Sequence, residues 1–467
     1  MLCAPLAGCT PAGEERPVAP SLNGESTTNV LVVDDPALAV AIREFAGEWK
    51  SLTGGGQLEI QELTVDQALT GGGWQKADAA LYPAHLVGVL ATQQRIEPLG
   101  EDDLTGDTIA WNDIFPLLRL REAAWGEQVY AVPLGSPQLV CFCRADMLAQ
   151  FGREPPRTWQ EYQELKDLFS DRSTFVEMIS HDAPWHAVLE PLAAGWAGLT
   201  LLARAAAYAK HPDHYSALFN MEDMEPLIDG PPFVRALEEL VAACAGEEPP
   251  PRYDVTAVRA AFWRGECALA LTWPTAAAAE TGEGIEVTAV PLPSSRDVFN
   301  PGQKAWEQRE SAQPSHVPLI AFAGRLASIA ADTPQRPLAL RLLNEIAGRQ
   351  WGGILSPRSP ATTLFRQSHI SSPAQWVEAG FSITAATAYA ELVSVTCTQT
   401  DGLPALRIPG RRQYLAVLDE AVWSTLYEGV AVEVALRRAA ARWREITREL
   451  ASDRQRQAYQ RSLGVLP

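Results

Sequence analysis

A strand–helix–strand unit near the start of the chain constrains the fold more than any other feature of the sequence. The run NVLVVDD, from Asn29 to Asp35, is short, continuously apolar and typical of a buried strand. Residues 36–52 follow with Pro36 at the start and apolar side chains at helical spacing, and QLEIQEL then alternates as a second strand. This order predicts a parallel sheet with a right-handed crossover, and therefore an α/β fold.

The same alternation continues along the chain. Strands are predicted for the runs ADAALYP, QLVCFCRADML, CALALTWP, IEVTAVPLPS and HVPLIAFAG. Thr158 followed by Glu161 forms a capping box and predicts a helix start. Residues 184–246 are predicted to be helical, 294–313 to be a loop, and 432–459 to be one long amphipathic helix.

Length and composition restrict the class of protein. A chain of 467 residues favours two domains, and its net charge of -19 argues against a nucleic-acid partner. Seven cysteines are too few for a disulfide scaffold, and the longest apolar run is interrupted by Arg204 before it could span a membrane. The 14 tryptophans serve either the core or stacking on a flat ligand such as a sugar ring.

Motifs for catalysis, cofactors and metals are absent from the sequence. It contains no nucleophile elbow, phosphate-binding glycine loop or zincin motif. His211 and His214 are too few for a metal site and are interpreted as loop residues. Cys141 and Cys143 alternate on a predicted strand and are interpreted as core thiols. We therefore expect a protein that is not an enzyme and has no cofactor and no metal.

Several blocks occur in the order found in one protein family. They are the strand Tyr130–Pro133, the block PPRTWQE at Pro155–Glu161, the run AFWRGECALALTWP, the strand Pro291–Pro293 and the helix Leu436–Trp443. In this order the chain resembles family 1 extracellular solute-binding proteins, the sugar-binding subunits of ABC importers. At Cys143-Arg144 it departs from the Tyr-Asn pair of that family.

The resemblance implies a two-lobed fold of the type II periplasmic-binding-protein class, in which each lobe is a mixed sheet flanked by helices. Lobe one is expected at 29–135 plus 318–352, and lobe two at 139–314 plus 357–467. Hinge crossings are expected near 135–139, 314–318 and 352–357. A small solute, a carbohydrate by the resemblance, would bind between the lobes and favour their closure, and an inner-membrane ABC permease would recognise the closed monomer. The alternative is a sensor or another non-transport protein on the same fold.

Candidate ligand contacts follow the predicted strands. Asp34 and Asp35 come after the first strand and either accept hydroxyls from a ligand or cap the next helix. Tyr82 ends the third strand and is either a ligand contact or a core tyrosine. Ser136 and Gln138 lie in the predicted hinge and carry groups that suit a polyol.

Three further candidates lie in turns. Trp273 ends a buried strand where the family often has a ligand contact. Trp196 stands in the stretch AAGWAG, which close helix packing explains equally well. Arg358, in SPRSP, is either a polar wall of the cleft or a surface residue.

The first residues suggest an envelope location. The tetrapeptide ending at Cys9, LAGC, looks like a bacterial lipobox, and 10–28 has the composition of a flexible tether. Together with the family resemblance, this predicts that 1–28 is a signal remnant with a tether. Cys9 is then the lipid anchor of a periplasmic or cell-envelope protein. The segment before Cys9 lacks the apolar region of a complete secretory signal.

Overall fold

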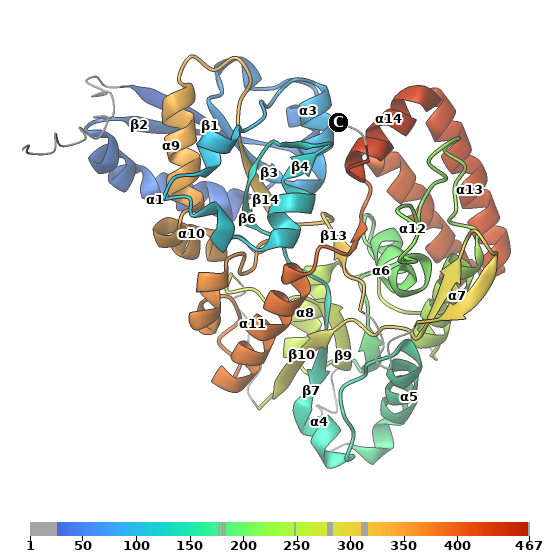
Figure 1. Ribbon diagram of the computed structural model, residues 1–467. Helices are drawn as coiled ribbons and strands as arrows, with labels where there is room; N and C mark the ends of the chain where they lie inside the picture. Colours follow the sequence, from blue (N-terminus) through green and yellow to red (C-terminus); the bar gives the residue numbers. More distant parts are fainter. Residues whose placement is uncertain are drawn as a thin grey trace, which may run out of the picture.

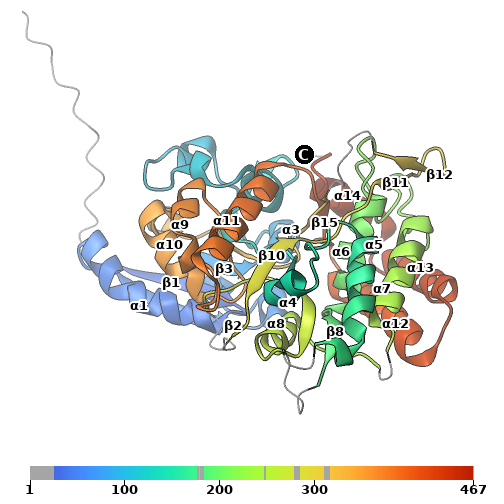
Figure 2. The ribbon, with the colours of Figure 1, turned by 90° about the horizontal axis from the view of Figure 1, so that it is seen from below.

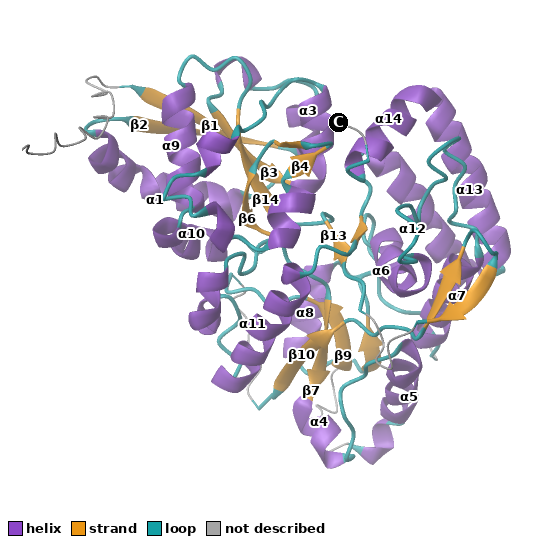
Figure 3. Ribbon diagram, in the orientation of Figure 1, coloured by secondary structure: helices purple, strands orange, loops and turns teal. Residues whose placement is uncertain are grey.

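A computed structural model describes residues 26–175, 178, 184–246, 249–277, 284–309 and 316–465 of the 467-residue chain. The predicted lipid anchor Cys9 and most of the predicted tether lie outside the described residues. Helices and strands alternate through the chain, and Figure 3 shows two separate β-sheets, each with helices packed around it. The mixed α/β class predicted from the sequence is confirmed.

The first sheet contains the unit that opens the fold. Its five strands have the order β2-β1-β3-β14-β6 and are β1 (Thr27–Val33), β2 (Gln57–Leu63), β3 (Ala79–Pro83), β6 (Val132–Gly135) and β14 (Arg325–Ile329). The strands β1, β2 and β3 are parallel, as the sequence predicts, and β14 runs antiparallel to both β3 and β6. Because β14 comes about 240 residues after β3, this sheet is completed only when the chain returns from elsewhere.

The second sheet has four strands in the order β10-β7-β9-β8. They are β7 (Val140–Arg144), β8 (His186–Leu189), β9 (Cys267–Thr272) and β10 (Val287–Pro291). The strand β7 is antiparallel to both of its neighbours, whereas β8 and β9 are parallel. Both sheets are therefore mixed. In the described part of the chain, three two-stranded pairs complete the β-structure: β4 (Ala124–Trp125) with β5 (Gln128–Val129), β11 (Asp297–Asn300) with β12 (Ala305–Gln308), and β13 (Leu319–Ile320) with β15 (Leu403–Pro404).

The helices cover these sheets. They are α1 (Pro36–Thr53), α2 (Val65–Leu69), α3 (Val87–Thr92), α4 (Ala145–Gln150), α5 (Trp159–Ser170), α6 (Ala197–Ala209), α7 (Pro231–Cys244), α8 (Val255–Trp263), α9 (Arg336–Ala347), α10 (Arg349–Leu355), α11 (Ile383–Thr398), α12 (Arg411–Glu428), α13 (Val432–Glu449) and α14 (Ser452–Ser462). The first, α1, begins after the capping residue Asp35 and ends at Gly54 with φ of +70°.

Figure 1 places the two sheets in different halves of the molecule. In the view from below, α1 and α9 of the first half lie on the left, and α7 and α13 of the second half lie on the right (Figure 2). The first half holds the first sheet with α1, α3 and α9, and the second half holds the second sheet with α5, α6, α7 and α12 to α14. The chain passes from β6 in the first sheet to β7 in the second through residues 136–139. It returns through residues 321–324, between β13 and β14.

Four sequence predictions of local structure are wrong in detail. Residues 186–189 form β8 instead of helix, and 297–308 form a hairpin instead of a loop. The strand predicted at 316–324 is reduced to β13, and the sheet strand is the next segment, β14. The predicted long C-terminal helix breaks at Ala451, whose φ of +68° separates α13 from α14. Pairing with distant segments decides β8 and β14, whereas β11 and β12 pair locally with each other; sequence periodicity reports neither kind of pairing.

Candidate functional site

Two crossing segments lie in direct contact where the halves meet. A β-carbon placed on Gly324 would lie 2.6 Å from Ser136 Oγ, so only glycine allows the second crossing to approach the first this closely. Gly324 has φ of +91° and Gly135 has φ of +118°, in the region that favours glycine. The close approach fixes the separation of the two segments.

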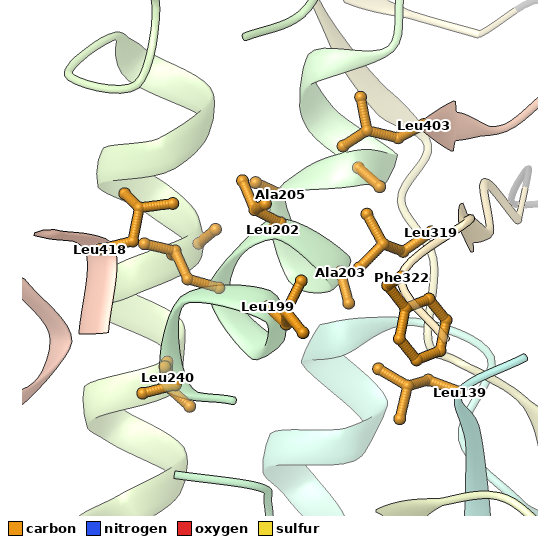
Figure 4. Close-up of a cluster of buried hydrophobic side chains, with 14 of the residues drawn as sticks. Leu139, Leu199, Leu202, Ala203, Ala205, Leu240, Leu319, Phe322, Leu403 and Leu418 are labelled. Carbon is orange, nitrogen blue, oxygen red and sulfur yellow. The ribbon is translucent and has the colours of Figure 1, made fainter. Parts of the chain in front are cut away.

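The crossings are held against the second half by apolar packing. Figure 4 shows Leu139 of the first crossing and Phe322 of the second near Leu199 and Ala203 of α6. All four side chains belong to one buried hydrophobic cluster. The polar groups that flank these residues are therefore positioned by a rigid core.

Asp35 and Asp34 lie at the edge of the first sheet that faces the crossings. The Asp35 carboxylate accepts the Leu38 N–H at 2.9 Å, as the cap of α1, and receives Arg325 Nε at 2.7 Å. The hydroxyl of Ser359 also donates to it. Asp34 is exposed, has φ of +54°, and accepts Arg325 Nη2 through its backbone carbonyl at 3.0 Å. The Asp35 carboxylate is thus fully used in hydrogen bonds within the protein. The Asp34 side chain, in contrast, is turned outward by a strained backbone.

An aromatic cluster lies on the side of the crossings that faces the second half. The ring centroids of Trp196 and Trp273 are 5.7 Å apart, and Phe322 lies 5.9 Å from Trp273 and 6.4 Å from Trp196. Trp273 is buried and its Nε1 donates to the Pro360 carbonyl at 2.9 Å. Trp196 is half-buried.

These contacts form a continuous series from Asp35 to Ser136. Asp35 binds Ser359, Pro360 binds Trp273, Trp273 contacts Phe322, and Phe322 is two residues before Gly324, which contacts Ser136. We call this region the junction and define it as Asp34, Asp35, His85, 135–139, Trp196, Trp273, 321–325, 359–360 and Arg411. The structure thus brings together six residues singled out from the sequence: Asp34, Asp35, Ser136, Gln138, Trp196 and Trp273.

The other two candidates lie outside the junction. Tyr82 is fully buried in the first half, where its hydroxyl lies 2.6 Å from Ser328 Oγ, and burial raises the pKa of its phenol. Arg358 is exposed and pairs with Glu44 of α1 at 3.1 Å. Their placement matches the core and surface alternatives that the sequence left open.

Sequence reasoning missed His85 and Arg411. His85 follows β3 as Asp34 follows β1, so the position after a parallel strand could have identified it. Arg411 begins α12 in the second half and has no such signal. The pKa of His85 is held well below its usual value, first by burial and then by the positive charges of Arg411 and Arg325, so its imidazole is neutral.

Asp419 of α12 was also missed. Its carboxylate accepts the backbone N–H of Gly195 at 2.6 Å and of Gly198 at 2.7 Å. These bonds hold the start of α6 and with it the ring of Trp196. Burial raises the pKa of Asp419, while the two N–H groups and Arg411 act in the opposite direction.

The junction contains buried polar atoms without partners. Among the described residues, neither Oε1 nor Nε2 of Gln138 has a hydrogen-bond partner, although the side chain is only 1% exposed. The same holds, within that part of the chain, for His85 Nδ1 and Arg411 Nε. Buried polar groups are nearly always hydrogen-bonded, so these atoms mark a place suited to a polar ligand.

A surface hollow of about 770 Å³ beside Arg235, Asp297 and Trp306 is a less suitable site. The Arg235 guanidinium is already paired with Asp297 at 3.0 Å and with Glu239 at 3.1 Å. It also lies over the Tyr208 ring, 4.4 Å from the centroid. The main cation of the hollow is therefore engaged by the protein itself.

Comparisons with known proteins identify the architecture. No protein family model matches the chain, and no curated protein matches it. Solved structures do match: a solute-binding protein of an ABC transporter from Agrobacterium radiobacter K84, in complex with ribitol, has a TM-score of 0.67 at 17% identity. The match covers 90% of this chain and 98% of that one. The chain has the fold of ABC-transporter solute-binding proteins.

Two further structures support the same conclusion. Maltose-bound MalE3 of T. maritima has a TM-score of 0.65 at 17% identity, covering 90% of this chain and 100% of that one. The sugar-binding protein MalE of Xanthomonas citri has a TM-score of 0.66 at 14% identity, covering 92% and 99%. The two-lobed fold predicted from the order of sequence blocks is therefore confirmed.

Other polar clusters of this solute-binding fold have structural partners. His211 Nε2 lies 3.1 Å from a Glu307 carboxylate oxygen. Cys141 and Cys143 have sulfur atoms 3.7 Å apart on β7, and burial raises the pKa of the Cys141 thiol well above its usual value. Across the described ranges, no group of three or more His, Cys, Asp and Glu side chains is arranged to hold a metal ion. Within the same ranges, none of the helices has the length and apolarity that a bilayer crossing requires.

Proposed function

We propose that this protein is the extracytoplasmic solute-binding subunit of an ABC-type importer and that it binds a sugar or polyol at the junction. In this proposal it acts as a monomer with lobe one at 29–135 plus 318–352 and lobe two at 139–314 plus 357–467. The lobes close around the solute, and an inner-membrane permease recognises the closed form. The protein is a binding protein and not an enzyme.

The observation that carries this proposal is the set of unpartnered polar atoms at the junction. Gln138 offers both a donor and an acceptor, which is what a hydroxyl group requires. Asp34 presents an exposed carboxylate nearby, and Trp196 presents a half-buried ring that suits the apolar face of a sugar. Ribitol and maltose, which the similar structures contain, are both polyhydroxylated solutes.

The two halves contribute different groups to the junction, and this explains how a bound solute would favour closure of the lobes. Asp34 and His85 belong to the first half, whereas Trp196 and Arg411 belong to the second. A solute that contacts both sets has a higher affinity for the closed arrangement than for an open one. Closure then follows from this difference in affinity and from nothing else.

A thermal-shift screen with ribitol, mannitol, maltose and maltotetraose tests the proposal. A solute at 100 times its Kd should stabilise the folded protein by about 2.7 kcal/mol and raise the Tm. The variant Gln138→Leu should lose this increase while the unliganded protein keeps its Tm, because the buried amide lacks partners among the described residues. Tyr82→Phe, which changes a core hydroxyl, is the matched control and should keep the increase. No shift with any of these or with other small solutes would contradict the proposal.

We propose further that Cys9 is lipidated and anchors the protein to the cell envelope, with 10–28 as a tether. The supporting observation is the LAGC tetrapeptide ahead of a Pro- and Gly-containing segment. Mass spectrometry of the mature N-terminus, after expression with the full upstream reading frame, should detect an acylated Cys9. An unmodified Cys9 behind a retained Met1 would contradict the anchor.

A further inference from the structure

Glu122 occupies an unusual place behind the junction. It is the last residue of a π-helical turn, Leu118–Glu122, and its side chain is fully buried. Turns of this kind are rare and often occur at functional positions. The residue is not among the groups proposed to contact the solute.

The carboxylate of Glu122 connects the two crossing segments. Its Oε1 accepts the hydroxyl of Ser136 at 2.9 Å and the backbone N–H of Ala321 at 2.8 Å. Ser136 belongs to the first crossing and Ala321 to the second. Ala321 has φ of +57°, which is unfavourable for a residue with a side chain, so the bond from Glu122 helps to hold a strained hinge residue in place.

Arg407 ties the same turn to the C-terminal part of the chain. Its Nη1 donates to the carbonyls of Arg121 at 2.8 Å and of Glu122 and Ala124 at 3.2 Å each. Its Nη2 donates to the Ser462 carbonyl at 2.6 Å. The backbone around Glu122 is therefore fixed to the second half, while its carboxylate holds both crossings.

Few charges surround this carboxylate. Arg407 is its cationic neighbour, and the Arg121 side chain points to the carbonyls of Thr400 and Leu463. The thiol of Cys397 on α11 also interacts with it, and burial raises the pKa of that thiol, so it stays neutral. Within the described ranges, Glu122 Oε2 has no hydrogen-bond partner. Burial raises the pKa of Glu122 to about 7, against the lowering effects of Ala321, Ser136 and Arg407.

We propose that Glu122 is the positioning residue of the hinge and that its protonation state sets the angle between the two lobes. This inference deepens the proposed function and rests on the two lobes moving about these crossings. Glu122 acts through Ser136 and Ala321, without touching the solute.

The direction of the effect follows from linkage. An arrangement that admits water to Glu122 returns its pKa toward 4.5, whereas the buried arrangement keeps it near 7. The proton is therefore held more strongly in the buried arrangement. Protonation of Glu122 therefore stabilises the buried arrangement relative to the hydrated one. This stabilisation is complete below pH 4.5 and is lost as the pH rises through about 7, where the ionised carboxylate favours the arrangement that hydrates it.

Small-angle X-ray scattering of the full chain without any solute, from pH 5 to pH 8.5, tests this inference. The wild type should change its interatomic distance distribution with a midpoint near pH 7. Glu122→Gln, which is neutral at every pH, should lose this transition and keep the wild-type distribution of pH 5. Ser136→Ala removes a donor that favours the carboxylate, so its midpoint should move to higher pH.

Glu378→Gln is the matched control. Glu378 is also buried beside an arginine, Arg259, and burial raises its pKa to about 7 as well, but it lies outside the hinge. This variant should retain the wild-type transition. A pH-independent wild type, or a Glu122→Gln protein that shifts like the wild type, would overturn the inference. Because no solute is added, a negative solute screen would leave this result unaffected and would count only against the proposed function.

Discussion

At the scale of single residues, the Arg325–Asp35 ion pair at the junction is the one whose loss we expect to lower stability. The two side chains are 9% and 1% exposed, with Nε and Oδ2 2.7 Å apart. Arg325→Met leaves a buried carboxylate without its cation, so we expect the free energy of unfolding to fall by about 3–5 kcal/mol. Urea denaturation measures this loss.

The control for this prediction is the exposed pair Arg43–Glu62, whose side chains are 44% and 42% exposed. Arg43→Met should cost at most about 1 kcal/mol, since water screens such a pair. Equal losses in the two variants would show that burial does not determine the strength of the Arg325–Asp35 pair.

His369 gives a prediction about acid stability. Its ring stacks on Trp376 at 4.7 Å and contacts Phe365 at 4.8 Å, and burial lowers its pKa to about 3. The folded protein disfavours the charged form of the His369 imidazole. The contribution of His369 to the free energy of unfolding is therefore complete above pH 6.5 and falls by about 1.4 kcal/mol per pH unit below it. His369→Phe should make the unfolding free energy less dependent on pH between 6.5 and 4.

Site residues were predictable where a local rule applied. Asp34 lies after a parallel strand, and the same rule extends to His85, which the sequence reasoning overlooked. Arg325 is different, because it reaches Asp35 across 290 positions and no local pattern in the sequence links the two. The partners of a buried charge depend on which distant segments pair in the tertiary structure, and a local sequence pattern does not contain that information.

At the scale of elements, the start of α5 tests how well local chemistry was predicted. The capping box expected at Thr158 is present: Glu161 N–H donates to Thr158 Oγ1 at 3.2 Å, and Thr158 N–H donates to Glu161 Oε2 at 3.2 Å. We expect Thr158→Ala to lower the unfolding free energy by about 1 kcal/mol. Thr158→Ser retains the hydroxyl and should stay close to the wild type in the same thermal or urea melts.

The elements that were missed share a physical cause. Helices with strong periodicity and clear ends, such as α1 and α5, were found from the sequence. The strand β8 has four residues and exists because it pairs with β9, and β14 exists because it fits between β3 and β6. Short strands are stabilised by their neighbours, so a sequence window cannot identify them reliably.

At the scale of the whole molecule, the order of motifs along the chain predicted the architecture better than any single motif did. Solved structures that are only 17% identical to this chain still share its two-lobed fold. The contacts between the halves were not predictable, since each half supplies them from loops such as 321–324 and from helix ends such as Arg411.

One ion pair joins the halves at the protein surface and leads to a prediction about their relative position. Arg412, in the first turn of α12, lies 2.9 Å and 3.0 Å from the two carboxylate oxygens of Asp66 on α2. The side chains are 82% and 66% exposed, so the pair contributes at most about 1 kcal/mol. That amount still changes the equilibrium between two lobe arrangements by about fivefold.

We therefore expect Asp66→Asn to shift the scattering-derived radius of gyration at low salt toward the value of a more open molecule. The wild type should show the same shift in about 1 M salt, where the screening length falls to about 3 Å. Glu62→Gln breaks the Arg43–Glu62 pair, which lies within one half, and should leave the radius unchanged. If Asp66→Asn matches the wild type at low salt, the ion pair does not hold the halves together.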